Sequence, residues 1–557
     1  MMMAIQAMEP SWSYYGLGEG SRVGSMCSAP GRSVRLLPSS AAAGLPVCST
    51  LSQGSYHQNS WRVDKVHHPR IGTSQASHRP LRVALRDQAE LSFSTPSSTP
   101  DLFLLDLASK LEDSIAGDDL QNDALSRLRE ESTEATLTCR WPTNKDEAYR
   151  FTDLRFLKKA DIYPVDSTPD TAASVDLSSW NFSESDGNRV VFVDGVLSKA
   201  LSQLEGLAEG LVVGSISNLP KEVIDNYVLP RLLGAVAKSQ GDVFACLNGI
   251  GVRDLGVIIV PEGVKIADPL QIIYISTQLV PEQRQGEGPA FSLSNPRLLV
   301  IVEKDGELNF VEDFVGAPDA VYWTNSVCEI VIAEQGQVSH NFLQEENRTS
   351  VYIRQTFVSQ AESSSYKLVE ACFGGRLSRH NLHVQQLGPD TSTEFYSFLL
   401  SGRNQLHDLH SKLILSHPRG FSRQLHKCIV TDSSGHSVFD GNVKVNRYAQ
   451  QTDAGQLSRS LLLAPRATVN VKPNLQIIAN DVKCSHGAAI SDLEEEQLFY
   501  FQARGIDTQT ARSALVFSFG AEVVQKLGSQ LKKRVESLVK DSLAAEGVIK
   551  RDISVSL

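Results

Sequence analysis

The chain has 557 residues, of which 41% are hydrophobic and 21% charged, so it has a globular composition and enough length for two to four structural units. Its formal net charge is −11, but residues 1–86 carry nine Lys and Arg against three acidic residues, which leaves −17 for residues 87–557. Such an acidic surface repels phosphate and anionic lipid, and no apolar run approaches the ~20 residues that cross a membrane, so neither nucleic-acid binding nor membrane insertion is expected.

Residues 1–86 are rich in Ser and Arg and poor in acidic residues, and they show no sustained apolar period. This composition predicts a transit peptide that is disordered before import, with processing near Val83-Ala84. A disordered regulatory tail is the alternative, because composition indicates disorder more directly than destination. The many Ser and small residues, without an Arg-bearing amphipathic helix at the start, favour a plastid over a mitochondrion.

Residues 87–184 are predicted to form an N-terminal helical region and a linker. Thr99-Pro100-Asp101 is a helix-start signal, and Gly117 separates two amphipathic helices. Beyond Trp141-Pro142, a polar and aromatic stretch at 146–154 leads into a mostly polar linker. The apolar positions of the two helices are Leu102, Leu105, Leu111 and Ile115 in the first and Leu120, Leu125 and Leu128 in the second.

Residues 185–482 are predicted to form a β-structured core. Short β-rich runs such as 256–260 and 298–302 are followed by turn residues such as Asp305-Gly306. Only 221–238 has helical periodicity, so a doubly wound α/β fold is disfavoured. Nearly 300 residues of short strands exceed a single sandwich and favour a β-solenoid, although no repeat length is evident.

Residues 483–557 are predicted to contain a candidate site segment and a C-terminal helical domain. Ser491–Glu494 has the pattern of a capping box, and Gly505 is expected to end that helix. A second helix is expected over about 508–527, and a third carries an apolar stripe. The helices either cap the open edge of the β-core or dock another protein, and the two roles are compatible. The stripe consists of Leu531, Val535, Leu538, Val539 and Leu543.

The chain lacks the motifs of common enzymes. The phosphate loop G-x-x-x-x-G-K-[ST], G-x-S-x-G, H-E-x-x-H and a Rossmann glycine fingerprint do not occur. We therefore expect a non-catalytic protein, and if ATP drives its process, a partner hydrolyses it. The eight cysteines include no CxxC pair, which favours a reducing compartment over a disulfide framework.

One segment carries a metal-ligand pattern. Cys484 and His486 lie two residues apart, so on a strand both side chains project from one face. Thiolate and imidazole together suit iron or zinc, but two ligands do not complete a site, so further donors must come from elsewhere, such as a partner chain. The alternative is structural: a buried thiol beside a hydrogen-bonded imidazole.

A second histidine pair has a different spacing. His407 and His410 are three residues apart, and on an extended chain this offset directs them to opposite faces, which argues against a shared metal. We interpret them as turn or surface residues.

The stretch 374–505 resembles SufD, a protein family of the SUF iron–sulfur cluster assembly pathway. The related SufB family has a Glu-His-Glu-Ala-like pattern where this chain has Cys484–Ala488, and this difference favours SufD. The stretch 147–154 is also similar to the family's N-terminal Glu-x-Trp-Arg-Tyr-Thr pattern. The matching motifs are Gly374–Arg379, Val438–Gly441, Ala449–Ala454, Gln456 with Ser460–Leu463, Lys472–Leu475 and Asp481–Ala488.

The resemblance implies a mainly β fold: a right-handed parallel β-helix flanked by N-terminal and C-terminal helical segments. It implies a scaffold in the chloroplast stroma that pairs with a SufB-like subunit through the β-helix and binds a SufC-like ATPase through the C-terminal helices. It also implies that His486, with Cys484 as second choice, is a candidate ligand at the SufB interface for iron or a transient cluster, neither permanently bound. Gln476 and Asn480 replace carboxylates of the family pattern, so this chain lacks the acidic side chains that the pattern places at those positions.

Two other functions are compatible with the sequence. In the first, the chain is a purely structural partner, His486 only packs, and the C-terminal helices provide the binding. In the second, the β-helix acts on polysaccharide, because that architecture also hosts lyases and hydrolases. No secretory signal and no evident acidic site support the second function.

Overall fold

The computed structural model describes residues 101–115, 123–165, 175, 177, 188–204, 206–232, 242–277 and 288–548. The expected transit peptide at 1–86 lies outside the described residues. Within these ranges, no helix is both long enough and apolar enough to cross a membrane.

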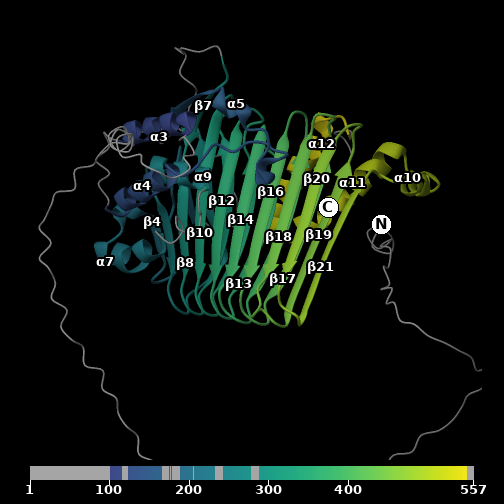
Figure 1. The fold of residues 1–557 in the computed structure, drawn as a ribbon. Helices are drawn as coiled ribbons and strands as arrows, with labels where there is room; N and C mark the ends of the chain where they lie inside the picture. Colours follow the sequence, from purple (N-terminus) through teal and green to yellow (C-terminus); the bar gives the residue numbers. More distant parts are fainter. Residues whose placement is uncertain are drawn as a thin grey trace, which may run out of the picture. The chain divides into compact units, whose positions relative to one another are not determined.

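The described chain forms two sheets whose strands alternate along the sequence (Figure 1). Sheet A has 11 strands and sheet B has 10, and from β8 to β21 even-numbered strands enter sheet A and odd-numbered strands enter sheet B. All pairs between these strands are parallel, so each turn contributes one strand to each sheet. This is a parallel β-solenoid of seven turns, which confirms the predicted fold class.

The strand bounds follow this alternation. Sheet A contains β1 Asp161–Pro164, β4 Val212–Ser215, β5 Gly256–Val260, β7 Ala290–Ser294, β8 Arg297–Val302, β10 Tyr322–Ile332, β12 Val351–Gln360, β14 Leu377–Gln386, β16 Leu406–Leu415, β18 His436–Val445 and β20 Thr468–Ile477. Sheet B contains β2 Arg189–Val193, β3 Val196–Leu197, β6 Lys265–Ser276, β9 Glu307–Gly316, β11 Gln337–Glu345, β13 Ser365–Cys372, β15 Ser392–Ser401, β17 Phe421–Val430, β19 Thr452–Leu462 and β21 Val482–Ser491.

The length of one turn varies. From β9 to β21, residues stacked on each other in sheet B are separated by 27 to 32 positions, which explains why no repeat length was evident in the sequence. One stacked series runs Gln337, Ser365, Ser392, Phe421, Asp453 and Lys483.

The corners that lead from sheet A to sheet B share one backbone device. At the six corners from β8–β9 to β18–β19 a non-glycine residue has a positive φ, between +57° and +60°. This conformation costs roughly 1–2 kcal/mol for an L-residue. Each such residue donates its backbone N–H to a carbonyl of the next turn, for example Gln335 to Glu362 at 2.9 Å, and this bond offsets the cost. The residues are Asp305, Gln335, Ser363, Asp390, Arg419 and Gln451.

The N-terminal helices cover the outer face of sheet A in the first turns. Helices α3 (Leu102–Ile115), α4 (Asp123–Thr136) and α9 (Val243–Gly251) contact each other, and α9 also contacts β10 and β12. The two expected helices are confirmed, but Leu102 is 81% exposed and does not belong to the buried face, and Gly117 and Leu120 lie outside the described residues. In the predicted helical stretch 221–238, the described residues form α7 (Lys221–Val223), the π-helical η4 (Ile224–Val228) and a further α-helical turn at 229–232.

The C-terminal region contains three helices, of which α11 and α12 pack on the outer face of sheet B. They are α10 (Glu495–Gln502), α11 (Thr508–Val524) and α12 (Ser529–Ala545), as predicted in number and order. The stripe residues Leu531, Val535, Val539 and Leu543 are buried with Phe398 and Leu400 of sheet B in one apolar cluster. Helices α11 and α12 therefore cover a face, so the expectation that the C-terminal helices cap the open edge of the β-core is wrong for these two.

The start of α10 differs from the prediction. Ser491 is the last residue of β21, and Glu494 is the N-cap residue without a side-chain capping bond. The capping-box interpretation is therefore wrong, because strand pairing with β19 extends to Ser491. Gly505 has a φ of +78° just beyond the helix, in agreement with its expected terminating role.

Candidate metal centre at the open end of the solenoid

The last turn of the solenoid is formed by β20 and β21, each of which pairs with a strand on one side only (Figure 1). Every residue of these two strands is half-buried or exposed, whereas the preceding strands have buried residues at alternate positions. An uncovered sheet edge offers unpaired backbone groups to another chain. The segment 483–491 thus forms part of the solenoid, where the sequence suggested a separate C-terminal region.

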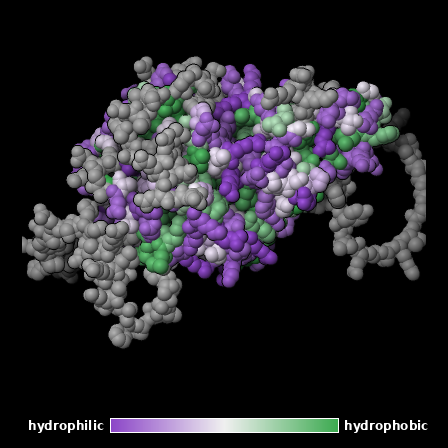
Figure 2. All heavy atoms as spheres, turned by 90° about the horizontal axis from the view of Figure 1, so that it is seen from above, coloured by the Kyte–Doolittle hydropathy of each residue, from purple (hydrophilic) through white to green (hydrophobic). Residues whose placement is uncertain are grey.

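Apolar side chains remain partly uncovered at this end. Val471, Leu475 and Val482 pack against the inner core but are only half-buried, and Ile477 and Ile490 are 45% and 48% exposed. Figure 2 looks from above onto one edge of the molecule and shows hydrophobic residues among hydrophilic ones on that side. Exposed apolar side chains grouped at one end of a fold are typical of a protein interface.

Cys484 and His486 lie on β21 and share one face, as predicted. They stack on Ala454 and Gln456 of β19, both of which face the interior, so both candidate ligands belong to the inner face of the last turn. Cys484 is half-buried and His486 is exposed. Burial raises the pKa of the Cys484 thiol, so a metal that binds there must displace a proton.

The candidate site is incomplete within this chain. Across the described ranges, no group of three or more His, Cys, Asp or Glu side chains is close enough to hold a metal ion. The donor types fit iron or zinc, but Cys484 and His486 provide only two ligands. Gln476 and Asn480 are both exposed near this end and carry amides, not carboxylates.

His407 and His410 point to opposite faces of β16, as expected from their spacing. His407 is buried in the interior, where its Nε2 lies 3.0 Å from the Gly374 carbonyl, and burial lowers its pKa to about 4. His410 lies on the outer face with its Nε2 2.8 Å from Asp408. Neither residue lies in a turn, because both belong to β16, and the interpretation as a surface residue is wrong for the buried His407 but not for His410 on the outer face.

The solenoid interior contains a charged cluster that the sequence analysis missed. Arg354 forms an ion pair with Glu312, and His340 Nε2 lies 2.8 Å from the same carboxylate. Burial opposes ionisation of Glu312, but Arg354 and His340 outweigh it and hold its pKa at about 2. A nearby pair joins His380 Nδ1 to Glu370 at 3.1 Å. The sequence signal for this cluster is a charged residue at an inward position between apolar ones, as Glu312 lies between Phe310 and Phe314 in β9.

The stretch 147–154 crosses the outer face of sheet A. The Arg379 guanidinium lies 4.0 Å from the centre of the Tyr149 ring, and Thr152 donates a hydrogen bond of 2.5 Å to Asp408. Glu147 forms an ion pair of 2.5 Å with Lys472 on the last strand of sheet A. This stretch therefore links the N-terminal region to the open end.

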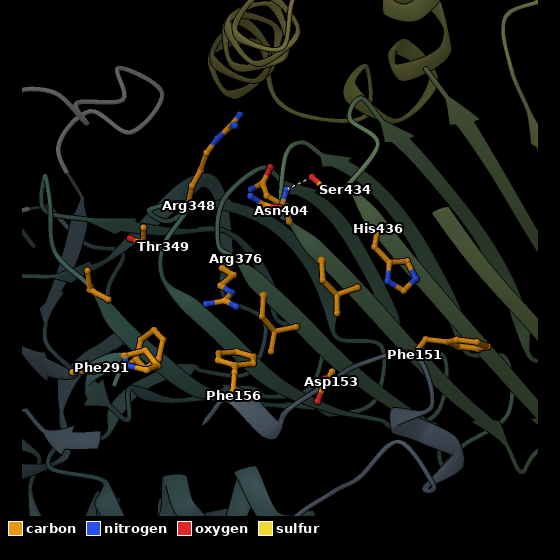
Figure 3. A pocket seen from close by; sticks show the side chains of 16 residues that line it. Phe151, Asp153, Phe156, Phe291, Arg348, Thr349, Arg376, Asn404, Ser434 and His436 are labelled. Atoms are coloured by element: carbon orange, nitrogen blue, oxygen red, sulfur yellow. Dashed lines mark hydrogen bonds between the residues drawn. The ribbon is translucent and has the colours of Figure 1, made fainter. Parts of the chain in front are cut away.

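A groove of about 1290 Å³ lies beside this stretch, along the corners that lead from sheet B to sheet A (Figure 3). Arg376 lies in it with its guanidinium 4.7 Å from the centre of the Phe156 ring, while Arg348 is paired with Glu546 at 2.6 Å. Neither Cys484 nor His486 lines this groove. It is thus separate from the candidate metal ligands.

Comparison with known proteins decides the family. The SufBD protein N-terminal region matches residues 104–272, and the SUF system FeS cluster assembly SufBD core domain matches residues 283–519. The Arabidopsis thaliana protein named Protein ABCI7, chloroplastic, is 48% identical over 453 residues, which are 81% of this chain and 92% of that protein. The chain belongs to the SufBD family.

Other relatives in the SufBD family refine this result. The Synechocystis protein named iron-sulfur cluster assembly SufBD family protein slr0076 is 33% identical and covers 73% of this chain and 88% of its own length. The Escherichia coli protein named iron-sulfur cluster assembly protein SufD is 29% identical, over 71% of this chain and 87% of that protein. The resemblance to SufD in the sequence is therefore confirmed, and the chain is a SufD-like member of plant type.

Proposed function

We propose that this chain is the scaffold subunit of a chloroplast stromal assembly that builds iron–sulfur clusters. The open end of the solenoid pairs with a SufB-like subunit, and His486, with Cys484 as second ligand, binds iron or a nascent cluster there in transit. The C-terminal helices bind a SufC-like ATPase. The chain itself is non-catalytic.

One observation carries this proposal: two soft metal ligands lie on the inner face of a strand that nothing in the described chain covers. Two ligands hold a metal weakly, so release to an acceptor is easy, and a partner strand at the same edge supplies the missing donors. The exposed apolar residues around this edge support burial against a protein. The plastid location is supported by the leader composition and by the name of the Arabidopsis relative.

The ligand role is tested with His486→Ala, co-expressed anaerobically with SufB-like and SufC-like partners. We expect the complex to form in unchanged yield, while its iron and sulfide content falls roughly tenfold or more, because losing a ligand costs at least as much as losing an outer-shell contact. Ser485→Ala is the matched control, since Ser485 is the exposed neighbour on the same strand. Unchanged iron and sulfide in the His486→Ala complex would remove the ligand assignment and leave a purely structural subunit.

The ATPase contact is tested at α10. In this helix only Phe501 is buried, and Phe499 is 69% exposed, which is unusual for a large aromatic side chain. Interface aromatic residues of this kind often contribute about 2 kcal/mol or more to binding. We expect Phe499→Asp to reduce the amount of SufC-like ATPase that co-purifies, with no change in the thermal unfolding of the isolated chain.

The control for this experiment is Leu387→Asp. Leu387 is another exposed apolar residue, 49% exposed, but it lies at a corner after β14, away from the C-terminal helices in the sequence. Equal loss of the ATPase in both variants, or no loss with Phe499→Asp, would contradict the assignment of α10 to this contact.

A further inference from the structure

The inner face of sheet B changes character toward the open end. One stacked row runs from Phe395 through Gln424 and Gln456 to His486, so an apolar position is followed by three polar ones. Gln424 and Gln456 are only 6% and 3% exposed. Two buried amides in the row that leads to the candidate ligand need hydrogen-bond partners.

Part of the hydrogen-bonding capacity of these two amides is satisfied inside the solenoid. Gln424 Oε1 accepts hydrogen bonds from Ser411 Oγ at 3.1 Å and from Gln456 Nε2 at 2.9 Å. Gln456 Oε1 is different, because it is buried and has no hydrogen-bond partner among the described residues. A buried acceptor without a donor costs about 1–3 kcal/mol, so we expect this oxygen to accept a hydrogen bond.

The orientation of the Gln456 amide is constrained on two sides. Its Nε2 is directed toward β17 by the bond to Gln424, so the oxygen of the same planar group is directed away from β17. A Cβ added at Gly441 would lie 2.3 Å from Nε2 and 2.8 Å from Oε1 of Gln456, so the Gln456 amide occupies the space above this glycine. Only a glycine at this position of sheet A leaves room for it.

Few donors are available on the side of the open end. In sheet B the residue stacked on Gln456 is His486, and in sheet A the residue stacked on Gly441 is Pro473, whose side chain has no polar group. On the side of the open end, a ring N–H of His486 is therefore the side-chain donor that the topology brings to this oxygen.

We propose that Gln456 is a positioning residue for His486. Gln456 Oε1 and His486 are not hydrogen-bonded in this structure; rotation of the exposed His486 side chain brings one ring N–H to this oxygen, which fixes the tautomer and leaves the other ring nitrogen free to bind iron. Metal-bound histidines commonly use their second nitrogen in this way. The inference rests on the proposed ligand role of His486, but it makes a separate statement about the ring in the metal-free chain.

The first test needs no metal. The full chain is labelled with ¹⁵N-histidine, and His486→Gln identifies the signals of His486. We expect one dominant tautomer in the wild type, a mixture of tautomers in Gln456→Leu, and return of the single tautomer in Gln456→Glu, which keeps an acceptor oxygen. His486 nitrogen signals that are identical in the wild type and Gln456→Leu would overturn the proposal and leave the glutamines as a structural amide ladder.

A second variant protects the test against misfolding. Gln456→Asn keeps a buried amide but is one methylene shorter, so it is expected to give the same tautomer mixture as Gln456→Leu. If Gln456→Leu fails to fold, Gln456→Asn alone decides, and an unchanged His486 tautomer in that variant overturns the proposal.

The second test measures iron in the complex with the SufB-like and SufC-like partners, loaded with ferrous iron alone. We expect Gln456→Leu to weaken iron binding about 10- to 100-fold, the usual effect of removing an outer-shell partner, and Gln456→Glu to restore it. If His486→Ala leaves iron binding unchanged, the proposed function fails. If His486→Ala weakens it but Gln456→Leu does not, only the positioning role fails.

Discussion

Arg354→Met is expected to lower the free energy of unfolding by about 3–5 kcal/mol, the usual cost of breaking a buried ion pair by removing one partner. The substitution leaves Glu312 and His340 in the solenoid interior without their cation, and Glu312 is completely buried. Methionine fills much of the same space between Phe314 and Phe342, whose rings Arg354 contacts, so lost packing contributes little. Urea denaturation followed by circular dichroism measures the change.

The matched control is Arg376→Met. Arg376 also contacts an aromatic ring, Phe156, but it is exposed and forms no ion pair among the described residues, so a change within about 0.5 kcal/mol is expected. The double variant Arg354→Met, Glu312→Gln should recover part of the stability, because it removes the unpaired charge. A loss below about 1 kcal/mol in Arg354→Met would contradict the role of the cluster.

Glu346→Gln is expected to remove a large pH dependence of stability. Burial raises the pKa of Glu346 to about 8, against 4.5 when exposed, and Thr324 donates a hydrogen bond of 2.7 Å to it. Between pH 4.5 and 8, the folded chain therefore keeps the proton on Glu346, whereas the unfolded chain has already released it. Stability falls as pH rises through this window, by up to about 1.4 kcal/mol per pH unit from this group, and levels off above pH 8.

The glutamine variant mimics the protonated acid, so it should gain stability relative to the wild type as pH rises from 5 to 8.5. Urea midpoints at several pH values measure this gain. Glu362→Gln, at an exposed corner residue, is the control and should follow the wild-type pH profile. Parallel pH profiles for the wild type and Glu346→Gln would show that this carboxyl does not keep its proton in the folded chain.

Much of the architecture follows from local patterns. Short β-rich runs separated by turn residues predicted the solenoid, and the stripe from Leu531 to Leu543 predicted α12. The repeat length could not be found because the corners differ in length, so stacked residues are 27 to 32 positions apart. The apparent capping box at Ser491 failed because strand pairing with β19, a contact between residues distant in sequence, outweighs a local signal.

The candidate site was predictable only in part. The two-residue spacing of Cys484 and His486 fixes their common face once the strand is assumed, and β21 confirms it. Which face that is depends on stacking against Gln456, some 30 residues earlier, and no local pattern contains this information. The same holds for Gly441, whose importance appears only when the opposite sheet brings an amide above it.

The corner hydrogen bonds have a consequence for how the site forms. Each turn is held by the one before and the one after it, and in such a one-dimensional array the terminal unit has only a single neighbour. The last corner bond runs from Gln451 to Asp481, at the entrance to β21, and no further turn follows to hold that strand. We therefore expect the strand with the candidate ligands to open by thermal fluctuation more readily than the strands that have a neighbour on both sides. A partner that docks there would order the strand and complete the metal site in a single event, so the iron site would exist only while the two subunits are joined.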